Sequence, residues 1–232
     1  MSTHRFRPLI SFRPVWQTYR MPSSRLSPAA SPASAAGPPP GPRLLLPGSP
    51  FSGNELRAME LDGLLVNVLE TGYIGSTEPI TPAHRALAAA AVLPAGFRRK
   101  VVLGRLTAAW VYGCAPPEPK VTVLLDHRYR ATSQGRCRAV RIHEVALGPA
   151  DTVGMAGVPL TSPLRTALDI AVHAPDEDAV PALLALSSVP TLKCPLGYIR
   201  QTLQLRPRMP GKAKALERVN SALAQRGAEE PP

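Results

Sequence analysis

Apolar residues recur at helical spacing over most of the chain from Phe51 onward. Thr81 is followed by Pro82, and Ser162 by Pro163, so in each pair a capping hydroxyl precedes a proline at the first helical position. This order is typical of a helix start. The spacing predicts helices over residues 52–60, 81–92, 106–112, 164–172, 176–187, 196–205 and 212–225, and an apolar face continued by Leu64, Leu65 and Val68 predicts a second short helix after the first.

Shorter apolar runs predict strands between these helices. The runs cover residues 72–75, 101–103, 121–126, 139–142 and 158–160. A bend near Ser133 and Gly135 is expected to join the third and fourth of these strands as a hairpin, and residues 148–157 are interpreted as a turn-rich segment. The predicted fold class is α+β, with a small mixed sheet packed with helices and a helical C-terminal tail.

The two ends of the chain lack this periodicity. Residues 22–50 are mostly Ser, Ala, Pro and Gly and bury too little apolar surface to offset the entropy of ordering, so residues 1–50 are expected to be a disordered basic leader. Met21 is a candidate for the true start, and a flexible basic arm along the DNA backbone is the functional alternative. Residues 226–232 are expected to be a disordered tail.

The net charge of +11 is unevenly distributed along the 232 residues. Residues 98–146 carry ten basic and three acidic side chains, and residues 193–232 carry eight and three. Residues 55–97 and 147–192 are acidic, with net charges of −3 and −4. Positive charge in blocks indicates a polyanionic partner, either nucleic acid or an acidic protein surface.

Three basic clusters are the candidate sites for phosphate contact, because the planar arginine fork makes two parallel hydrogen bonds to a phosphate. A solvated basic face, enriched in arginine by GC-rich codon usage, is the alternative interpretation. The predicted DNA contacts are Arg98, Arg99, Lys100 and Arg105 around one strand, Arg128, Arg130, Arg136, Arg138 and Arg141 on or near the predicted hairpin, and Arg206, Arg208, Lys212 and Lys214 near the last helix.

Catalytic and metal-binding patterns are not found in the sequence. The five histidines never lie at i and i+4 on one helix, and the GxxxxGK[ST], GxGxxG and GxSxG patterns do not occur, so we expect no metal, no cofactor and no enzyme. Three widely spaced cysteines fit a reducing cytoplasm rather than a disulfide framework, and no apolar run is long enough for a membrane span. Asp126, His127 and His143 are the candidates for a cryptic acid–base site.

Two stretches carry a resemblance to a known family: VVLGRLTAAWVYG at residues 101–113 and VGMAGVPLTSPLRTALDIAVHAP at residues 153–175. With the predicted hairpin between them, they resemble the actinobacterial AbiEi-type antitoxins over roughly residues 50–225. Both are packing motifs rather than chemical ones. The resemblance implies an N-terminal winged-helix DNA-binding part, a C-terminal antitoxin domain, and autorepression of an operon that also encodes a nucleotidyltransferase toxin.

On this resemblance, residues 51–97 are expected to form a reduced winged-helix-like region and residues 98–225 an AbiEi antitoxin C-terminal-like domain. The winged-helix part would have to fit between Phe51 and Ile74, which leaves room for about two short helices and one hairpin. Because residues 55–97 are acidic, DNA contact is expected from the basic clusters instead. The chain also ends before the nuclease domain that follows this core in related proteins would fit.

The expected function is that of an antitoxin-like DNA-binding transcriptional autorepressor in a type IV, AbiE-like operon. Its expected partners are the DNA of its own promoter region and a nucleotidyltransferase toxin, which it counteracts without requiring a stable complex. The alternative is an orphan non-enzymatic module that binds an acidic protein or RNA.

Overall fold

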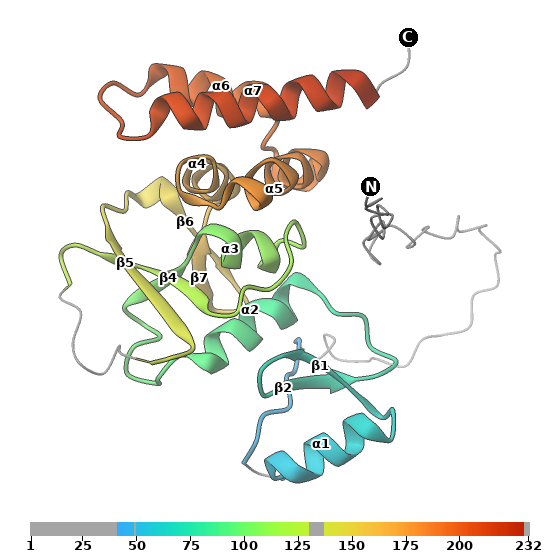
Figure 1. Cartoon of the computed structure of the whole chain (residues 1–232). Helices are drawn as coiled ribbons and strands as arrows, with labels where there is room; N and C mark the ends of the chain where they lie inside the picture. The colour runs from blue at the N-terminus through green and yellow to red at the C-terminus, as the bar shows by residue number, and fades with distance from the viewer. Residues whose placement is uncertain (1–40, 49, 130–136, 230–232) are drawn as a thin grey trace, which may run out of the picture. The chain divides into compact units, whose positions relative to one another are not determined.

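The computed structural model describes residues 41–48, 50–129 and 137–229. These residues contain seven α-helices, a two-stranded sheet and a five-stranded sheet (Figure 1). The sheet is mixed and small, and the helices follow it towards the C-terminal end of the chain. The predicted α+β fold class is therefore confirmed.

A short helix and a hairpin come first. Helix α1 (Gly53–Leu61) begins at Ser52, whose hydroxyl and the carboxylate of Glu55 exchange hydrogen bonds with each other's backbone N–H groups. Strands β1 (Leu65–Leu69) and β2 (Gly72–Gly75) then pair in antiparallel register. The buried side chains of these three elements form a small core of their own, made of Leu56, Leu65 and Tyr73 with Leu45, Phe51 and Met59 around it.

The second short helix predicted after α1 is wrong. Leu65 and Val68 lie in β1, where the alternation of Val66 and Val68 suits a pleated strand better than a helix. Hydrogen bonding to β2 stabilises the strand, and the helical spacing of the leucines gives no sign of this pairing. Within residues 53–75, the described chain therefore has one helix before the hairpin, where a helix-turn-helix needs two.

The five-stranded sheet has the order β5-β4-β3-β7-β6. Its strands are β3 (Val101–Leu103), β4 (Val121–Asp126), β5 (Val140–Val145), β6 (Thr152–Met155) and β7 (Val158–Thr161). The pairs β3–β4 and β6–β7 are antiparallel, whereas β3–β7 and β4–β5 are parallel. The central strands β4, β3 and β7 carry most of the buried apolar side chains of the sheet.

The hairpin predicted from β4 to β5 is wrong, because the two strands run parallel, with Val121 beside Val140 and Asp126 beside Val145. A parallel pair needs a connection that returns to the starting end of the first strand, and such connections take a dozen or more residues. Residues 127–139 meet that length. A bend alone cannot distinguish this return from a hairpin, and the bend predicted near Ser133 and Gly135 lies outside the described residues.

Residues 148–157, which the sequence predicts to be a turn-rich segment, contain a strand. Strand β6 pairs with β7 across the two-residue turn Ala156–Gly157, in which both residues have positive φ, 49° and 78°. Positive φ at both central positions is the geometry of a tight hairpin turn, and glycine adopts it without strain. Alanine at the first of the two positions hides the usual turn signal.

Helices surround the larger sheet and follow it. Figure 1 shows α3 and α4 beside the sheet, and α6 and α7 stacked beyond α4 and α5. The helices are α2 (Pro82–Val92), α3 (Arg105–Val111), α4 (Pro163–His173), α5 (Asp176–Ser188), α6 (Leu196–Leu205) and α7 (Lys212–Glu229). Thr81 and Ser162 cap α2 and α4 as predicted, with Pro82 and Pro163 in the first turn.

The C-terminal helix is longer than predicted. Helix α7 continues through Glu229, so the first four residues of the segment expected as a disordered tail are helical. Ala215, Val219 and Ala222 are fully buried and lie at helical spacing on the face that packs against α4, α5 and α6. Burial of this face stabilises the helix beyond its last buried residue.

Candidate nucleic-acid interface

A hollow of about 360 Å³ opens where β3 begins and β4 ends. Because β3 and β4 are antiparallel neighbours, the residues just before β3 and just after β4 lie at the same edge of the sheet. Arg99 and Lys100 therefore line this hollow together with Arg128 and Tyr129. Two clusters that are well separated in sequence thus supply three cations and an aromatic ring to one concave site.

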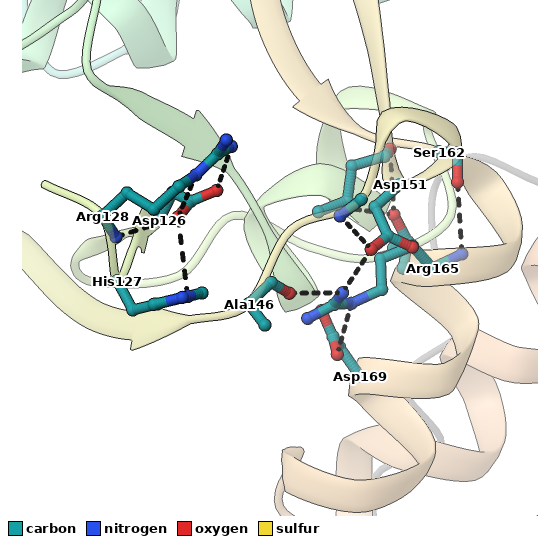
Figure 2. Close-up of polar contacts among 11 residues, drawn as sticks. Asp126, His127, Arg128, Ala146, Asp151, Ser162, Arg165 and Asp169 are labelled. Atoms are coloured by element: carbon teal, nitrogen blue, oxygen red, sulfur yellow. Dashed lines mark hydrogen bonds and ion pairs between the residues drawn. The ribbon is translucent and has the colours of Figure 1, made fainter. Parts of the chain in front are cut away.

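Asp126, the last residue of β4, holds the Arg128 side chain in place (Figure 2). Nε of Arg128 donates to Oδ1 of Asp126 at 3.0 Å, Nη2 donates to Oδ2 at 2.7 Å, and the backbone N–H of Arg128 donates to Oδ1 at 3.0 Å. These hydrogen bonds lower the pKa of Asp126 to about 2. The Arg128 side chain is nevertheless 70% exposed, so its remaining N–H groups face solvent.

One wall of the hollow is formed by the segment of the chain that joins β5 to β6, and Arg165 of α4 fixes this segment. Nη1 of Arg165 donates to the carbonyl of Ala146 at 3.1 Å and to Oδ2 of Asp151 at 2.8 Å, while Nε donates to both oxygens of Asp169 at 3.0 Å (Figure 2). The same Asp151 oxygen accepts the N–H of Gly148 at 2.8 Å. Arg165 is therefore a positioning residue that ties the lining of the hollow to the helical layer.

Arg165 and Asp151 are not among the predicted site residues. Arg165 and Asp169 form an ion pair at i, i+4 spacing on α4. No local pattern indicates Asp151, because it precedes Arg165 by 14 residues and β7 lies between them. The sequence indicates Asp126 only as a half of an acid–base pair. Its role in holding Arg128 depends on the conformation of the chain after β4.

Two of the predicted phosphate contacts, Arg98 and Lys212, bind carbonyls at helix ends. Arg98 donates from Nη2 to the carbonyl of Ala91 at 3.1 Å and from Nε to that of Leu93 at 2.9 Å, at the C-terminal end of α2. Lys212 donates from Nζ to two carbonyls at the end of α6, both at 2.8 Å. Helix C-termini leave carbonyls without intrahelical partners, and cations are stabilised there by the helix dipole.

Apart from Arg105, the remaining predicted contacts fall into three groups. Lys214 pairs with Asp176 at 2.9 Å, and Arg141 lies 3.8 Å from Glu118. Arg130 and Arg136 lie outside the described residues. Five predicted contacts have exposed side chains that make no hydrogen bond or ion pair with another described residue, namely Arg99, Lys100, Arg138, Arg206 and Arg208.

Arg105 is half-buried in a polar cluster. Its Nη1 lies 2.9 Å from Nε2 of His143. A guanidinium only donates, so this nitrogen of His143 accepts and the imidazole is neutral. Burial, followed by the charges of Arg105 and Arg141, lowers the pKa of His143 to about 4. Arg105 also has a φ of 54°, a strained value for a residue other than glycine, at the turn from β3 into α3.

This cluster predicts a pH dependence of stability. The pKa of His143 is lower in the folded chain than its ordinary value of 6.5, so the unfolded chain binds more protons between about pH 6.5 and pH 4. The free energy of unfolding should therefore fall as the pH is lowered through this window, by about 1–2 kcal/mol after allowance for solvent screening. Urea titrations of the wild type and of His143→Gln at several pH values measure this contribution.

The loss expected between pH 6.5 and pH 4 should be smaller in the His143→Gln variant. Asp126, whose pKa is lowered from 3.8 to about 2, keeps its stabilising contribution above about pH 4 and loses it as the pH falls from there towards 2, which is below the window of His143. The pKa of His173 is also lowered by burial, which leaves a residual slope of the same sign in the variant. Identical pH dependences for the two proteins would contradict the assignment.

Among residues 41–229 apart from the gaps, no three His, Cys, Asp or Glu side chains are grouped so that they could hold a metal ion. No single helix described is long and apolar enough to cross a membrane, although Asp176–Ser188 and Pro190–Leu205, bent by 88° at their junction, meet that length and composition together.

The sequence matches a known protein family over slightly more than half of its length. The model of the AbiEi antitoxin C-terminal domain matches residues 100–217, a span that holds the whole five-stranded sheet and helices α3 to α6. No curated protein matches the sequence. Among solved structures, that of the RV2827C protein from Mycobacterium tuberculosis is 20% identical with a TM-score of 0.42, and the match covers 75% of this chain and 65% of that one.

The matched region includes Lys100, Arg128 and Tyr129 of the hollow, together with Arg165, which holds its wall. Arg99 directly precedes it. The extent of this match assigns the protein to the AbiEi antitoxin family.

Proposed function

We propose that this AbiEi-family protein is a DNA-binding transcriptional autorepressor of a type IV toxin–antitoxin operon. In this proposal it binds the DNA of its own promoter region and counteracts a nucleotidyltransferase toxin without a required stable complex. Family membership supports the antitoxin role. The observation that carries the DNA contact is the convergence of Arg99, Lys100 and Arg128 on one hollow at the edge of the sheet.

The chemistry of these three side chains suits phosphate. Arg99 and Lys100 are exposed and without a described partner, and Arg128 is oriented by Asp126 while most of its side chain remains in solvent. A guanidinium that is already fixed loses less side-chain entropy when it binds a phosphate oxygen. Arg138, Arg206 and Arg208 are further exposed cations, and we assign them supporting contacts with the DNA backbone.

Arg98, Arg105 and Lys212 have smaller roles in this proposal, because their charged groups already bind carbonyls or His143. Lys214 pairs with a carboxylate and stays exposed, as Arg128 does, but it does not line the hollow, so we assign it a supporting contact. No catalytic step is included either. Asp126 and His143, two candidates for acid–base chemistry, each bind an arginine, and their lowered pKa values make them weak bases at neutral pH.

The first experiment is a titration of the full chain into two fluorescent duplexes, the DNA upstream of its own gene and a scrambled duplex of the same composition. Each titration is run at two or more salt concentrations, because counterion release makes phosphate contacts salt-sensitive. Autorepression predicts tight, salt-sensitive preference for the upstream DNA. Weak and equal binding to both duplexes would contradict it and favour the module that binds an acidic protein or RNA.

Removing the cations of the hollow should weaken DNA binding strongly. In the variant Arg99→Ala/Lys100→Ala/Arg128→Ala, we expect the slope of log affinity against log salt to decrease by about 3, or about 1 for each lost contact. Affinity at about 0.1 M salt should fall by roughly 500-fold, since a slope of about 0.9 for each contact corresponds to about a factor of eight there and three contacts are lost.

The matched control removes three arginines of the same total charge elsewhere, as Arg57→Ala/Arg200→Ala/Arg226→Ala. If DNA contact depends on the hollow, this control should retain the salt slope within about one unit. Equal losses in the two variants would mean that only the net charge matters, and the hollow would then not be the DNA contact.

A further inference from the structure

The lining of the hollow is only partly basic. Besides the three cations, it contains the aromatic ring of Tyr129 and apolar groups from Val102, Leu147 and Pro159. Tyr129 is 52% exposed, although it is a large aromatic residue with an apolar surface to bury. A site that served only to contact phosphates would need neither the ring nor the apolar wall.

The shape of the hollow also restricts its ligand. A volume of about 360 Å³ lies in the range of small-molecule pockets. A paired duplex presents a convex backbone and keeps its bases stacked inside, so its phosphates can contact the cations but its bases cannot enter the hollow. An unpaired nucleotide, by contrast, has a flat apolar base next to an anionic phosphate, which matches a lining that combines an aromatic residue and apolar groups with cations.

We infer that the hollow binds an unpaired nucleotide, with its base against Tyr129 and the apolar wall and its phosphate at Arg99, Lys100 and Arg128. This inference rests on the proposed function, because it takes the hollow to be the nucleic-acid contact. It goes further by naming the ligand, which is a single strand or a base that has left the duplex stack.

The recognition is tolerant of base identity. Of the residues lining the hollow, Asp126 already uses both carboxylate oxygens on Arg128, and the N–H of Gly148 is bound to Asp151. Apart from the cations and main-chain groups, the hydroxyls of Thr152 and Tyr129 are the polar groups of the lining that remain to read a base edge. Stacking on an aromatic ring is available to every base, so we expect similar affinities for strands of different sequence.

The test measures the binding of the full chain to three fluorescent DNAs by anisotropy. These are a 12-nucleotide single strand of thymidines, the fully paired upstream duplex, and the same duplex with one bulged nucleotide. Tyr129→Ala should weaken binding to the single strand and the bulged duplex by about ten-fold, within the range found for base–aromatic stacking. Binding to the fully paired duplex should change by less than about two-fold.

Two control variants distinguish stacking from a structural effect. Tyr129→Phe keeps the ring and should bind the single strand as the wild type does, whereas Tyr198→Ala removes an equally exposed tyrosine on α6 and should have no effect. The inference is overturned if the wild type does not bind the single strand, or if Tyr129→Ala weakens the paired and unpaired ligands equally or leaves all three unchanged.

The two proposals can fail separately. If the triple variant of Arg99, Lys100 and Arg128 loses the paired upstream duplex while Tyr129→Ala binds every ligand normally, autorepression stands and the unpaired nucleotide is excluded. If the wild type shows no preference for its upstream duplex but binds single strands through Tyr129, autorepression is excluded and the ligand assignment stands.

Discussion

The variant Arg218→Ala should have a free energy of unfolding about 3 kcal/mol lower than that of the wild type. Arg218 is only 6% exposed, and its Nη1 and Nη2 donate to the carbonyls of Ala171 and Ala174 at 2.8 and 2.7 Å. These carbonyls lie at the end of α4. Arg218, which belongs to α7, also pairs with Asp176 at the start of α5. Alanine leaves buried acceptors without partners and opens a cavity, and each effect costs about 1–3 kcal/mol.

Chemical denaturation followed by circular dichroism measures this loss. Lys214→Ala is the matched control, since Lys214 contacts the same Asp176 but is 54% exposed, and exposed ion pairs contribute about 1 kcal/mol or less. Arg218→Met keeps much of the side-chain volume, so its stability relative to Arg218→Ala separates packing from hydrogen bonding. A loss below about 1 kcal/mol in Arg218→Ala would show that water replaces the guanidinium at the helix end.

A methyl group at Gly104 should destabilise the fold by about 2–3 kcal/mol. Gly104 stands between β3 and α3, and a Cβ atom there would lie 2.6 Å from Cγ of Leu124 and 2.8 Å from its Cδ1. Leu124 is fully buried in the central strand β4, so it has little room to move. Extra atoms in a packed core cost typically 1–3 kcal/mol because side chains or backbone must shift.

Thermal and urea unfolding of Gly104→Ala test this expectation. Gly154→Ala is the control, because a Cβ atom at Gly154 would meet nothing within 4 Å. The double variant Gly104→Ala/Leu124→Ala should be less destabilised than the sum of its single variants, since the shortened side chain leaves space for the new methyl group. Strict additivity would mean that the close approach to Leu124 is not the cause.

Helix starts could be predicted from the sequence because they depend on neighbouring residues. The hydroxyls of Thr81 and Ser162 accept free backbone N–H groups within one turn, and the prolines that follow them have no N–H to satisfy. The structure places the starts of α2 and α4 at these pairs. The direction of β5 could not be predicted in this way. It depends on pairing with β4 across thirteen intervening residues, and the apolar alternation of a strand is the same in either direction.

In the candidate site, too, local features could be predicted from the sequence and tertiary contacts could not. The sequence could predict that Arg98, Arg99 and Lys100 form a basic cluster. It could not predict which of these side chains makes hydrogen bonds within the protein. Arg98 is bound to carbonyls because α2 ends nearby, and that proximity is a tertiary fact. Likewise, Arg128 reaches the same hollow as Arg99 only because β3 and β4 are antiparallel neighbours.

The parallel pairing of β4 and β5 also sets how the length of the protein can vary. Residues 127–139 must span β4, about 20 Å at roughly 3.3 Å for each of its six residues, and can reach about 45 Å when extended. Up to about half of this segment can therefore be deleted before β5 is pulled out of register, and doubling it costs only about 0.6 kcal/mol of closure entropy. Insertions and deletions between homologues should accumulate here, so that partner contacts can diverge while the sheet is unchanged.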